Sequence, residues 1–268
     1  MLSLCGMAAA ASLSFGQAIL IPNSSPDALW ALDPDTGDVI TTIPLTFTST
    51  PINAIDGPNG TILLSDQVND TIFQLDAGGN LIGNYITAPI DNIRGIHRFP
   101  NGIVAGATST GMYAWDTAGD IRTEFIDGDF FDVNFVNNLV IGTDIDDDNV
   151  QAYNFGLTLV GETTPGGVDF PEQCALVRDP VTGQPLLAVA SFTPDTVYFF
   201  SVSGNLVSSF PILGGASGRG VIQLTSGNLL VADSSNGIVE YLFDGTFVRT
   251  IATGTSFRYL ELSRNFQP

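Results

Sequence analysis

The chain has no lysine, one histidine and two cysteines, and each of these shortages excludes a class of site. All eight basic residues are arginines and stand against 28 acidic residues, so a formal net charge of −20 would repel a nucleic-acid partner. With His97 as the single histidine, H-E-x-x-H zinc motifs and histidine-rich metal clusters are excluded. Hydrophobic residues nevertheless make up 44% of the chain, which is enough for a packed core.

Motifs of nucleophilic catalysis are also missing. Ser217 lies in a glycine-rich turn, but Arg219 stands where the nucleophile elbow G-x-S-x-G needs its second glycine. Cys174 lies in the apolar run "CALV", which is typical of an inert core cysteine. The other cysteine, Cys5, lies in the N-terminal stretch described next, so we expect no disulfide in the mature chain.

The N-terminal stretch "MLSLCGMAAAASLSFGQA" is apolar and rich in small residues. Its Gly-Gln-Ala ending is similar to an A-x-A cleavage site, so residues 1–18 are predicted to be a signal peptide and the protein to be secreted. The alternative is that these residues form a buried first strand. The apolar run is too short to span a bilayer, and no membrane span is expected.

A repeated pattern runs through the rest of the chain. "TILLSDQVNDTIFQLDAGGNLIGNYI" at residues 61–86 and "NLLVADSSNGIVEYLFDGTFVRTI" at 228–251 share strand-like runs separated by polar and glycine-containing turns. Aligning these turns gives five copies, each with four short runs of β type: residues 51–88, 92–127, 130–163, 171–211 and 218–252. No window shows a sustained helical period, so the copies are predicted to be antiparallel meanders.

Four strands per repeat of roughly 40 residues predict a β-propeller. Residues 18–45 supply three further strands, and "FRYLEL" at residues 257–262 supplies a fourth. The predicted fold is therefore all-β: one domain, residues 19–268, with six four-stranded antiparallel blades. The C-terminal strand closes the ring by joining the N-terminal blade, which hides strand edges that would otherwise aggregate.

Two blades carry a more specific pattern. "GNLLVADSSNGIVEYLFDGTFVRTI" and "NGTILLSDQVNDTIFQLDAGGNLIGNYI" resemble the NHL repeat, and "DPDTGDVITTIPL" in the first blade looks more like the related YVTN repeat. The resemblance covers almost all of the mature chain but concerns blades and turns. It implies a six-bladed propeller of a kind that includes ligand and protein binders, streptogramin-lyase-like enzymes and metal-dependent lactonases, so the fold does not choose the function.

Three arginines are predicted to meet at one mouth of the propeller. Arg94 and Arg219 stand at the starts of predicted innermost strands, in the similar stretches "IRGI" and "GRGV". Arg258 in "FRYL" has the same position within one residue. Guanidinium groups suit carboxylate or sulfate groups. The stretches predict a site for an acidic sugar or small acid; the alternative is that the arginines pair with the protein's own acids.

The opposite side of the ring is expected to carry acids. Asp132 and Glu172 stand on innermost strands of blades four and five, and His97 lies on an innermost strand of blade three. Resemblance to lactonases of the gluconolactonase type implies metal ligands in the channel, for which Asn53, Asp132 and Glu172 are the nearest equivalents. The alternative for His97 is a packing residue between blades.

The turn "TDIDDDN" is a second candidate for a metal. Its carboxylates at alternate positions, Asp144, Asp146 and Asp148, could bind Ca²⁺, although the glycine and distal glutamate of an EF-hand are missing. A solvated acidic turn is the alternative. No other cofactor is expected.

Together these features favour a secreted, monomeric, NHL-like propeller that binds a protein or an anionic small molecule or carbohydrate through Arg94, Arg219 and Arg258. The alternative is a metal-dependent lactonase or lyase that uses Asp132, Glu172 and His97.

Overall fold

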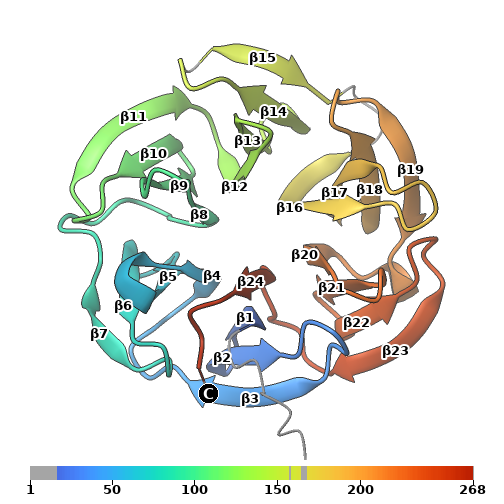
Figure 1. Ribbon diagram of the computed structural model, residues 1–268, viewed down its shortest axis with the longest axis horizontal. Helices are drawn as coiled ribbons and strands as arrows, with labels where there is room; N and C mark the ends of the chain where they lie inside the picture. Colours follow the sequence, from blue (N-terminus) through green and yellow to red (C-terminus); the bar gives the residue numbers. More distant parts are fainter. Residues whose placement is uncertain (1–16, 157, 164–167, 268) are drawn as a thin grey trace, which may run out of the picture.

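Six four-stranded sheets form the blades of a ring in the computed structural model, which describes residues 17–156, 158–163 and 168–267 (Figure 1). Every pair of neighbouring strands is antiparallel, and the chain runs from the innermost strand of a blade outwards. The predicted six-bladed propeller is therefore confirmed.

The blades are numbered from the N-terminus, and their strands are given from the axis outwards. Blade 1 has β24 (Glu261–Ser263), β1 (Ala18–Ser24), β2 (Asp27–Leu32) and β3 (Val39–Pro44); blade 2 has β4 (Pro51–Asp56), β5 (Ile62–Asp66), β6 (Thr71–Leu75) and β7 (Leu81–Asn84); blade 3 has β8 (Ile96–Arg98), β9 (Val104–Thr108), β10 (Gly111–Trp115) and β11 (Ile121–Asp127). Blade 4 has β12 (Phe130–Val136), β13 (Leu139–Asp144), β14 (Asn149–Tyr153) and β15 (Leu159–Glu162); blade 5 has β16 (Asp169–Arg178), β17 (Pro185–Thr193), β18 (Thr196–Ser201) and β19 (Leu206–Pro211); blade 6 has β20 (Gly218–Gln223), β21 (Leu229–Asp233), β22 (Gly237–Tyr241) and β23 (Phe247–Ala252). Two short 3₁₀ turns, η1 (Pro58–Gly60) and η2 (Leu213–Gly215), complete the secondary structure of the described residues.

The core lies between the blades. Second strands such as β5 and β21 are buried at every position because both of their faces are covered by neighbouring blades, so they are nearly continuous apolar runs. Buried side chains gather in hydrophobic clusters, one at each junction between adjacent blades. Outer strands such as β7 and β23 are mostly exposed.

The closing strand is shorter than predicted. β24 pairs with β1 through Leu20↔Glu261, Ile19↔Leu262 and Ala18↔Ser263, whereas residues 257–260 form only a single bridge, between Phe257 and Asn23. Ala18 is buried in β1, so the first strand begins one residue before the predicted domain boundary. Residues 1–16 of the predicted signal peptide lie outside the described residues.

The backbone of residues 258–260 explains the shortening, because its donors turn to other blades. The Arg258 amide donates to Pro22 O over 2.9 Å, but the Tyr259 amide donates to Ile52 O of blade 2 over 3.2 Å. The Leu260 amide donates to the side-chain oxygen of Gln173 in blade 5 over 3.0 Å. A ladder with β1 therefore resumes only at Glu261.

We refer to residues 257–261 as the central plug, because they join blades on opposite sides of the axis. The Tyr259 hydroxyl, from blade 1, donates to Phe131 O in blade 4 over 3.1 Å, and its side chain is fully buried. Gln173 Nε2 donates to Leu260 O over 2.9 Å, and Gln173 Oε1 also accepts from the Val221 amide of blade 6 over 3.1 Å. The plug thus fixes the blades relative to one another.

No helix within the described ranges is both long enough and apolar enough to cross a membrane.

Replacing Gln173 with methionine tests the plug. The variant leaves the buried Leu260 N–H, Leu260 C=O and Val221 N–H without their side-chain partner. We expect Gln173→Met to lower the free energy of unfolding by about 2–4 kcal/mol, measured by urea denaturation. The matched change at the exposed turn residue Gln184 should cost less than about 0.5 kcal/mol. Equal, small losses in both variants would show that the plug does not hold the ring.

Candidate functional site

The innermost strands begin on one face of the ring, and most of them start with a β-bulge. In β12 the register skips from Phe130 to Asp132, and in β20 it skips from Gly218 to Gly220. The extra residues are Phe131 and Arg219. β16 has a similar shift between Pro171 and Cys174, which contains Glu172. A bulge bends the strand and re-aims the side chain of the extra residue, so these side chains are available to the face, which we call the entry face.

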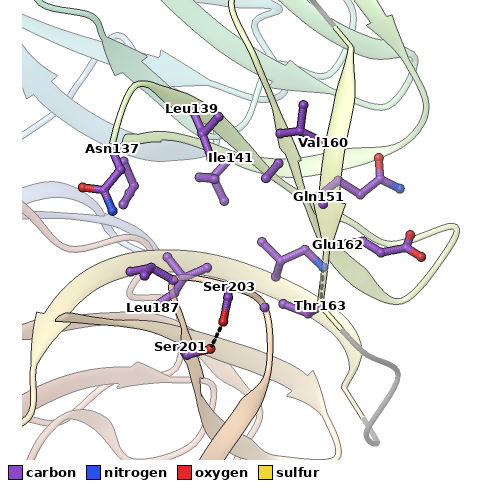
Figure 2. Close-up of a pocket in the computed structure, with 16 residues that line it drawn as sticks. Asn137, Leu139, Ile141, Gln151, Val160, Glu162, Thr163, Leu187, Ser201 and Ser203 are labelled. Carbon is purple, nitrogen blue, oxygen red and sulfur yellow. Dashed lines mark hydrogen bonds between the residues drawn. The ribbon is translucent and has the colours of Figure 1, made fainter. Parts of the chain in front are cut away.

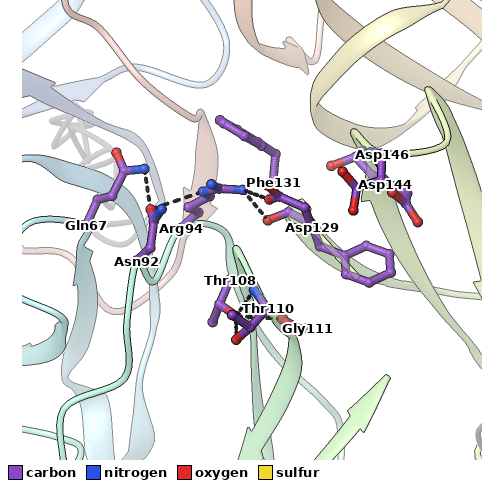
Figure 3. A network of polar contacts seen from close by, with 12 residues as sticks. Gln67, Asn92, Arg94, Thr108, Thr110, Gly111, Asp129, Phe131, Asp144 and Asp146 are labelled. Carbon is purple, nitrogen blue, oxygen red and sulfur yellow. Dashed lines mark hydrogen bonds and ion pairs between the residues drawn. The ribbon is translucent and has the colours of Figure 1, made fainter. Parts of the chain in front are cut away.

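Arg94 lies on the entry face between blades 3 and 4. Its Nη1 forms an ion pair with Asp129 and donates to Phe130 O over 3.0 Å, while Nε donates to Asn92 Oδ1 over 3.2 Å (Figure 3). The guanidinium carbon lies 3.9 Å from the centre of the Phe131 ring. The side chain is only 6% exposed, so this arginine is largely occupied by the protein itself.

Arg219 has a similar environment in blade 6. Its Nη1 forms an ion pair with Glu172 of blade 5, and its guanidinium carbon lies 4.4 Å from the centre of the Phe192 ring. Glu172 is 2% exposed and Arg219 is 20% exposed. Breaking such a buried pair from one side is strongly destabilising, because the remaining charge stays desolvated.

Three phenylalanines connect the two arginines. The centre of the Phe170 ring lies 4.9 Å from that of Phe131 and 5.4 Å from that of Phe192. Together Arg94, Phe131, Phe170, Phe192 and Arg219 form what we call the arginine–phenylalanine arc. All three rings are partly exposed, so the arc offers apolar surface between two cations.

Arg258 differs from the other two arginines. Its Nε and Nη2 donate to Ser24 Oγ over 3.3 and 3.2 Å, and among the described residues no carboxylate lies within ion-pair distance of it. Burial lowers the pKa of Arg258, and the charge of Arg219 lowers it further, although Glu172 and Tyr259 oppose this. A partly buried cation beside a second cation is a favourable place for an anion.

Glu172 brings the three arginines together. Burial raises the pKa of Glu172, and the charges of Arg219, Arg258 and Arg94 oppose that rise. The expectation that the acids lie on the opposite side of the ring is therefore wrong for Glu172, because the bulge in β16 places it among the arginines. For Arg94 and Arg219 the structure shows the alternative interpretation, pairing with the protein's own acids.

Asp132 joins blades 4 and 5. Its Oδ2 accepts from the Cys174 amide over 3.0 Å, and its own amide donates to Thr143 Oγ1 over 2.8 Å. The Thr143 hydroxyl in turn donates to Glu172 O over 2.7 Å. Asp132 is fully buried, and this burial, followed by the charge of Glu261, raises the pKa of its carboxyl group well above the usual range.

His97 lies in β8 with no hydrogen bond to a carboxylate among the described residues. Its ring centre is 6.1 Å from that of Phe99. Burial lowers the pKa of His97 to about 4, so the imidazole is neutral near pH 7. This environment matches the packing interpretation of the residue.

The acidic turn after β13 does not assemble a ligand set. Asp144 Oδ1 accepts from the amides of Asp146 and Asp147, and its Oδ2 accepts from Gln151 Nε2 over 2.8 Å. Asp148 Oδ1 accepts instead from the Phe170 amide over 3.0 Å. Across the parts of the chain that the structure describes, no group of three or more His, Cys, Asp or Glu side chains could hold a metal ion.

Sequence reasoning missed the residues that shape the entry face. These are Ser24, Asp129, Phe131, Phe170, Phe192 and Tyr259. A signal existed in the placement of a phenylalanine just before Asp132 and another just before Pro171, near the starts of two innermost strands.

The fold and this face define a six-bladed β-propeller with a surface of arginine and phenylalanine side chains at the start of its innermost strands. No protein-family model matches the chain, and no curated protein matches it in sequence.

Solved structures match it closely in fold. A chain in a nidogen/laminin complex is 13% identical over 94% of this chain and 100% of that chain, with a TM-score of 0.72. A protein of unknown function from Bacteroides caccae is 16% identical over 93% and 99% of the two chains (TM-score 0.68). Virginiamycin B lyase from Staphylococcus aureus is 13% identical over 88% and 84% (TM-score 0.61). These likenesses agree with the predicted resemblance to NHL-type propellers, and at such identities they concern the fold.

The pairing of Arg219 with Glu172 leads to a test by paired substitution. Arg219→Gln leaves Glu172 buried without its partner, so we expect the free energy of unfolding to fall by about 2–4 kcal/mol. Adding Glu172→Gln removes the unpaired charge and should restore at least half of the loss, as measured by urea denaturation at pH 7. If the double variant is less stable than Arg219→Gln by the full cost of a second independent change, the two groups do not interact.

The raised pKa of Glu261, in the central plug, leads to a prediction of how the free energy of unfolding varies with pH. Burial raises its pKa from 4.5 to about 7, so the folded protein retains a proton that the unfolded chain has released. The contribution of this retained proton to the free energy of unfolding is complete below pH 4.5 and is lost as the pH rises through 7. We expect Glu261→Gln to exceed the parent in stability by about 1–3 kcal/mol at pH 8 and to equal it near pH 4.5. Asp91→Asn, which removes a surface charge, should give a difference that does not change over this range.

Proposed function

We propose that the protein is an exported binding module that holds an anionic ligand on its entry face. The observation that carries the proposal is Arg258, a partly buried guanidinium that donates to Ser24 and has, among the described residues, no carboxylate at ion-pair distance. On this face Arg94, Arg219 and Arg258 stand against Asp129 and Glu172. Arg94 and Arg219 are paired with these carboxylates, which leaves Arg258 as the arginine of this face that is available to a ligand.

The chemistry of the face favours a carboxylate or sulfate group attached to an apolar or cyclic body. A guanidinium presents a planar fork of donors that matches these anions. The rings of Phe131, Phe170 and Phe192 offer apolar contact within the same arc. Acidic sugars, small organic acids and acidic segments of a partner protein all carry this combination.

Export is part of the proposal. The apolar N-terminal residues and the absence of lysine support it. The likeness to a propeller in a nidogen/laminin complex supports a protein partner as one form of the ligand.

A lyase or lactonase remains the second candidate, supported by the fold of virginiamycin B lyase. It would require His97, Asp132 or Glu172 to act on substrate. His97 is a packed, neutral side chain and Asp132 a link between blades, whereas Arg258 is available to a ligand. The binding role therefore needs fewer changes to the observed arrangement.

The test is a comparison of thermal shifts. Glucuronate, benzoate and sulfate serve as probes at low salt with the parent protein, Arg258→Gln and Arg178→Gln. Arg178 is exposed and lies at the far end of β16, so it is the matched control. A probe at a hundredfold its Kd should stabilise the parent and Arg178→Gln by about 2.7 kcal/mol, and Arg258→Gln by much less. Equal shifts in all three proteins, or no shift with any anion, would contradict the proposal.

A further inference from the structure

A cavity of about 320 Å³ lies between blades 4 and 5, away from the entry face (Figure 2). Its walls come from β13, β14 and β15 of blade 4 and from Leu187 of blade 5. The turn at Ser201–Gly204 forms its other boundary. A volume of this size is at the lower end of the range for small-molecule sites, roughly 300–1,000 Å³.

The register of the outer strands explains why this junction is hollow. In blades 1, 2 and 5, a large residue after or in the fourth strand lies opposite a residue near the start of the third strand. These pairs are Ile43 opposite Leu29, Tyr85 opposite Ile72 and Phe210 opposite Val197. Blade 4 has the same register, with the Thr163 amide donating to Val150 O over 2.9 Å. Thr163 is therefore the small residue at a position that a bulky side chain fills elsewhere. Blades 3 and 6 have a bulge at this point, so their registers differ.

At two of the filled junctions, a glycine of the following blade lies against the filling side chain. A Cβ added to Gly79 would meet the Ile43 side chain at 2.6 Å, and one added to Gly245 would clash with the Phe210 side chain. At the hollow junction, a Cβ on Gly204 would meet backbone, Glu162 O at 2.7 Å and Thr163 Cα at 3.6 Å, just as one on Gly119 would meet Tyr85 O between blades 2 and 3. The Thr163 hydroxyl accepts from the Val150 amide over 3.0 Å, so it is held against its own blade.

The boundary of the cavity indicates which ligands fit. Its apolar walls come from Val136, Leu139, Ile141, Val150 and Leu187, and no arginine is found among the described residues of its lining. Glu162 lies at the edge, where a ligand anion would be repelled. Ser201 and Ser203 hydroxyls bond to each other over 2.9 Å, so few polar groups are left for a charged ligand.

We propose that this cavity is a second binding site, for a small, uncharged and largely apolar molecule of the size of two or three aromatic rings. The site is separate from the entry face and does not depend on the function proposed for that face. Filling it would complete a blade junction in the way that Phe210 completes the next one.

A matched pair of dyes tests the site. N-phenyl-1-naphthylamine is neutral and fluoresces strongly in apolar surroundings, and 8-anilinonaphthalene-1-sulfonate has the same rings with an added anionic group. We expect the neutral dye to bind the parent protein with at least tenfold higher affinity at this site than the sulfonate. Thr163→Phe should reduce binding of the neutral dye at least tenfold, because the new ring occupies the cavity, with Tm unchanged or raised.

Two further variants make the result decisive. Ala152→Leu narrows the cavity from β14 and should also weaken the neutral dye, which keeps the test open if Thr163→Phe does not fold. Thr42→Phe adds the same ring to the exposed face of β3 and should leave dye binding unchanged. Equal neutral-dye affinity in the parent, Thr163→Phe and Ala152→Leu would overturn the proposal, as would equal losses in Thr42→Phe and Thr163→Phe. Equal affinity for the sulfonate at this site would overturn the inference that the ligand is uncharged.

Discussion

The structure depends on how the backbone of residues 258–260 satisfies its polar groups at the axis of the ring. These amides and carbonyls are buried, and a buried backbone group without a partner costs about as much as a lost hydrogen bond. Blade 1 alone does not supply all of the partners, so Ile52 and Gln173 supply them from blades 2 and 5. The hydrogen bonds of these three residues thereby hold blades 1, 2 and 5 in a fixed arrangement around the axis.

The same constraint shapes the entry face. Because Tyr259 reaches Phe131 O and lies near Glu172, the first residues of β12 and β16 are fixed relative to the plug. Their bulges turn Phe131 and Glu172 towards the arginines, and the bulge in β20 does the same for Arg219. The local backbone geometry, and not the overall negative charge of the protein, therefore decides which groups these arginines contact.

The sequence was sufficient to predict the blades, because each of five repeats carries four strand-length apolar runs with glycine turns between them. It also brought Arg94, Arg219 and Arg258 to one face through their common position near the starts of innermost strands. The bulges were not predictable, since one inserted residue changes which side chain faces the axis without changing the apolar pattern. For this reason Glu172 was expected across the ring from the arginines. The closing strand was expected to begin at Phe257 because the apolar pattern does not show that the amides of Tyr259 and Leu260 donate to other blades. The hollow junction at Thr163 could be recognised only once the registers of four outer strands were aligned.

Closure of blade 1 by the two ends of the chain has a consequence for biosynthesis. β1 is among the first described segments to be made and β24 is among the last, so the inner edge of β1 has no strand partner until residues 261–263 have emerged. Blades 2 to 6 each consist of consecutive strands and can form in order during translation. The ring then closes in one late, long-range step, which is slow because distant parts of the chain must meet. Until that step, the nascent protein is an open arc with one unpaired edge, the form in which aggregation and chaperone binding compete with folding.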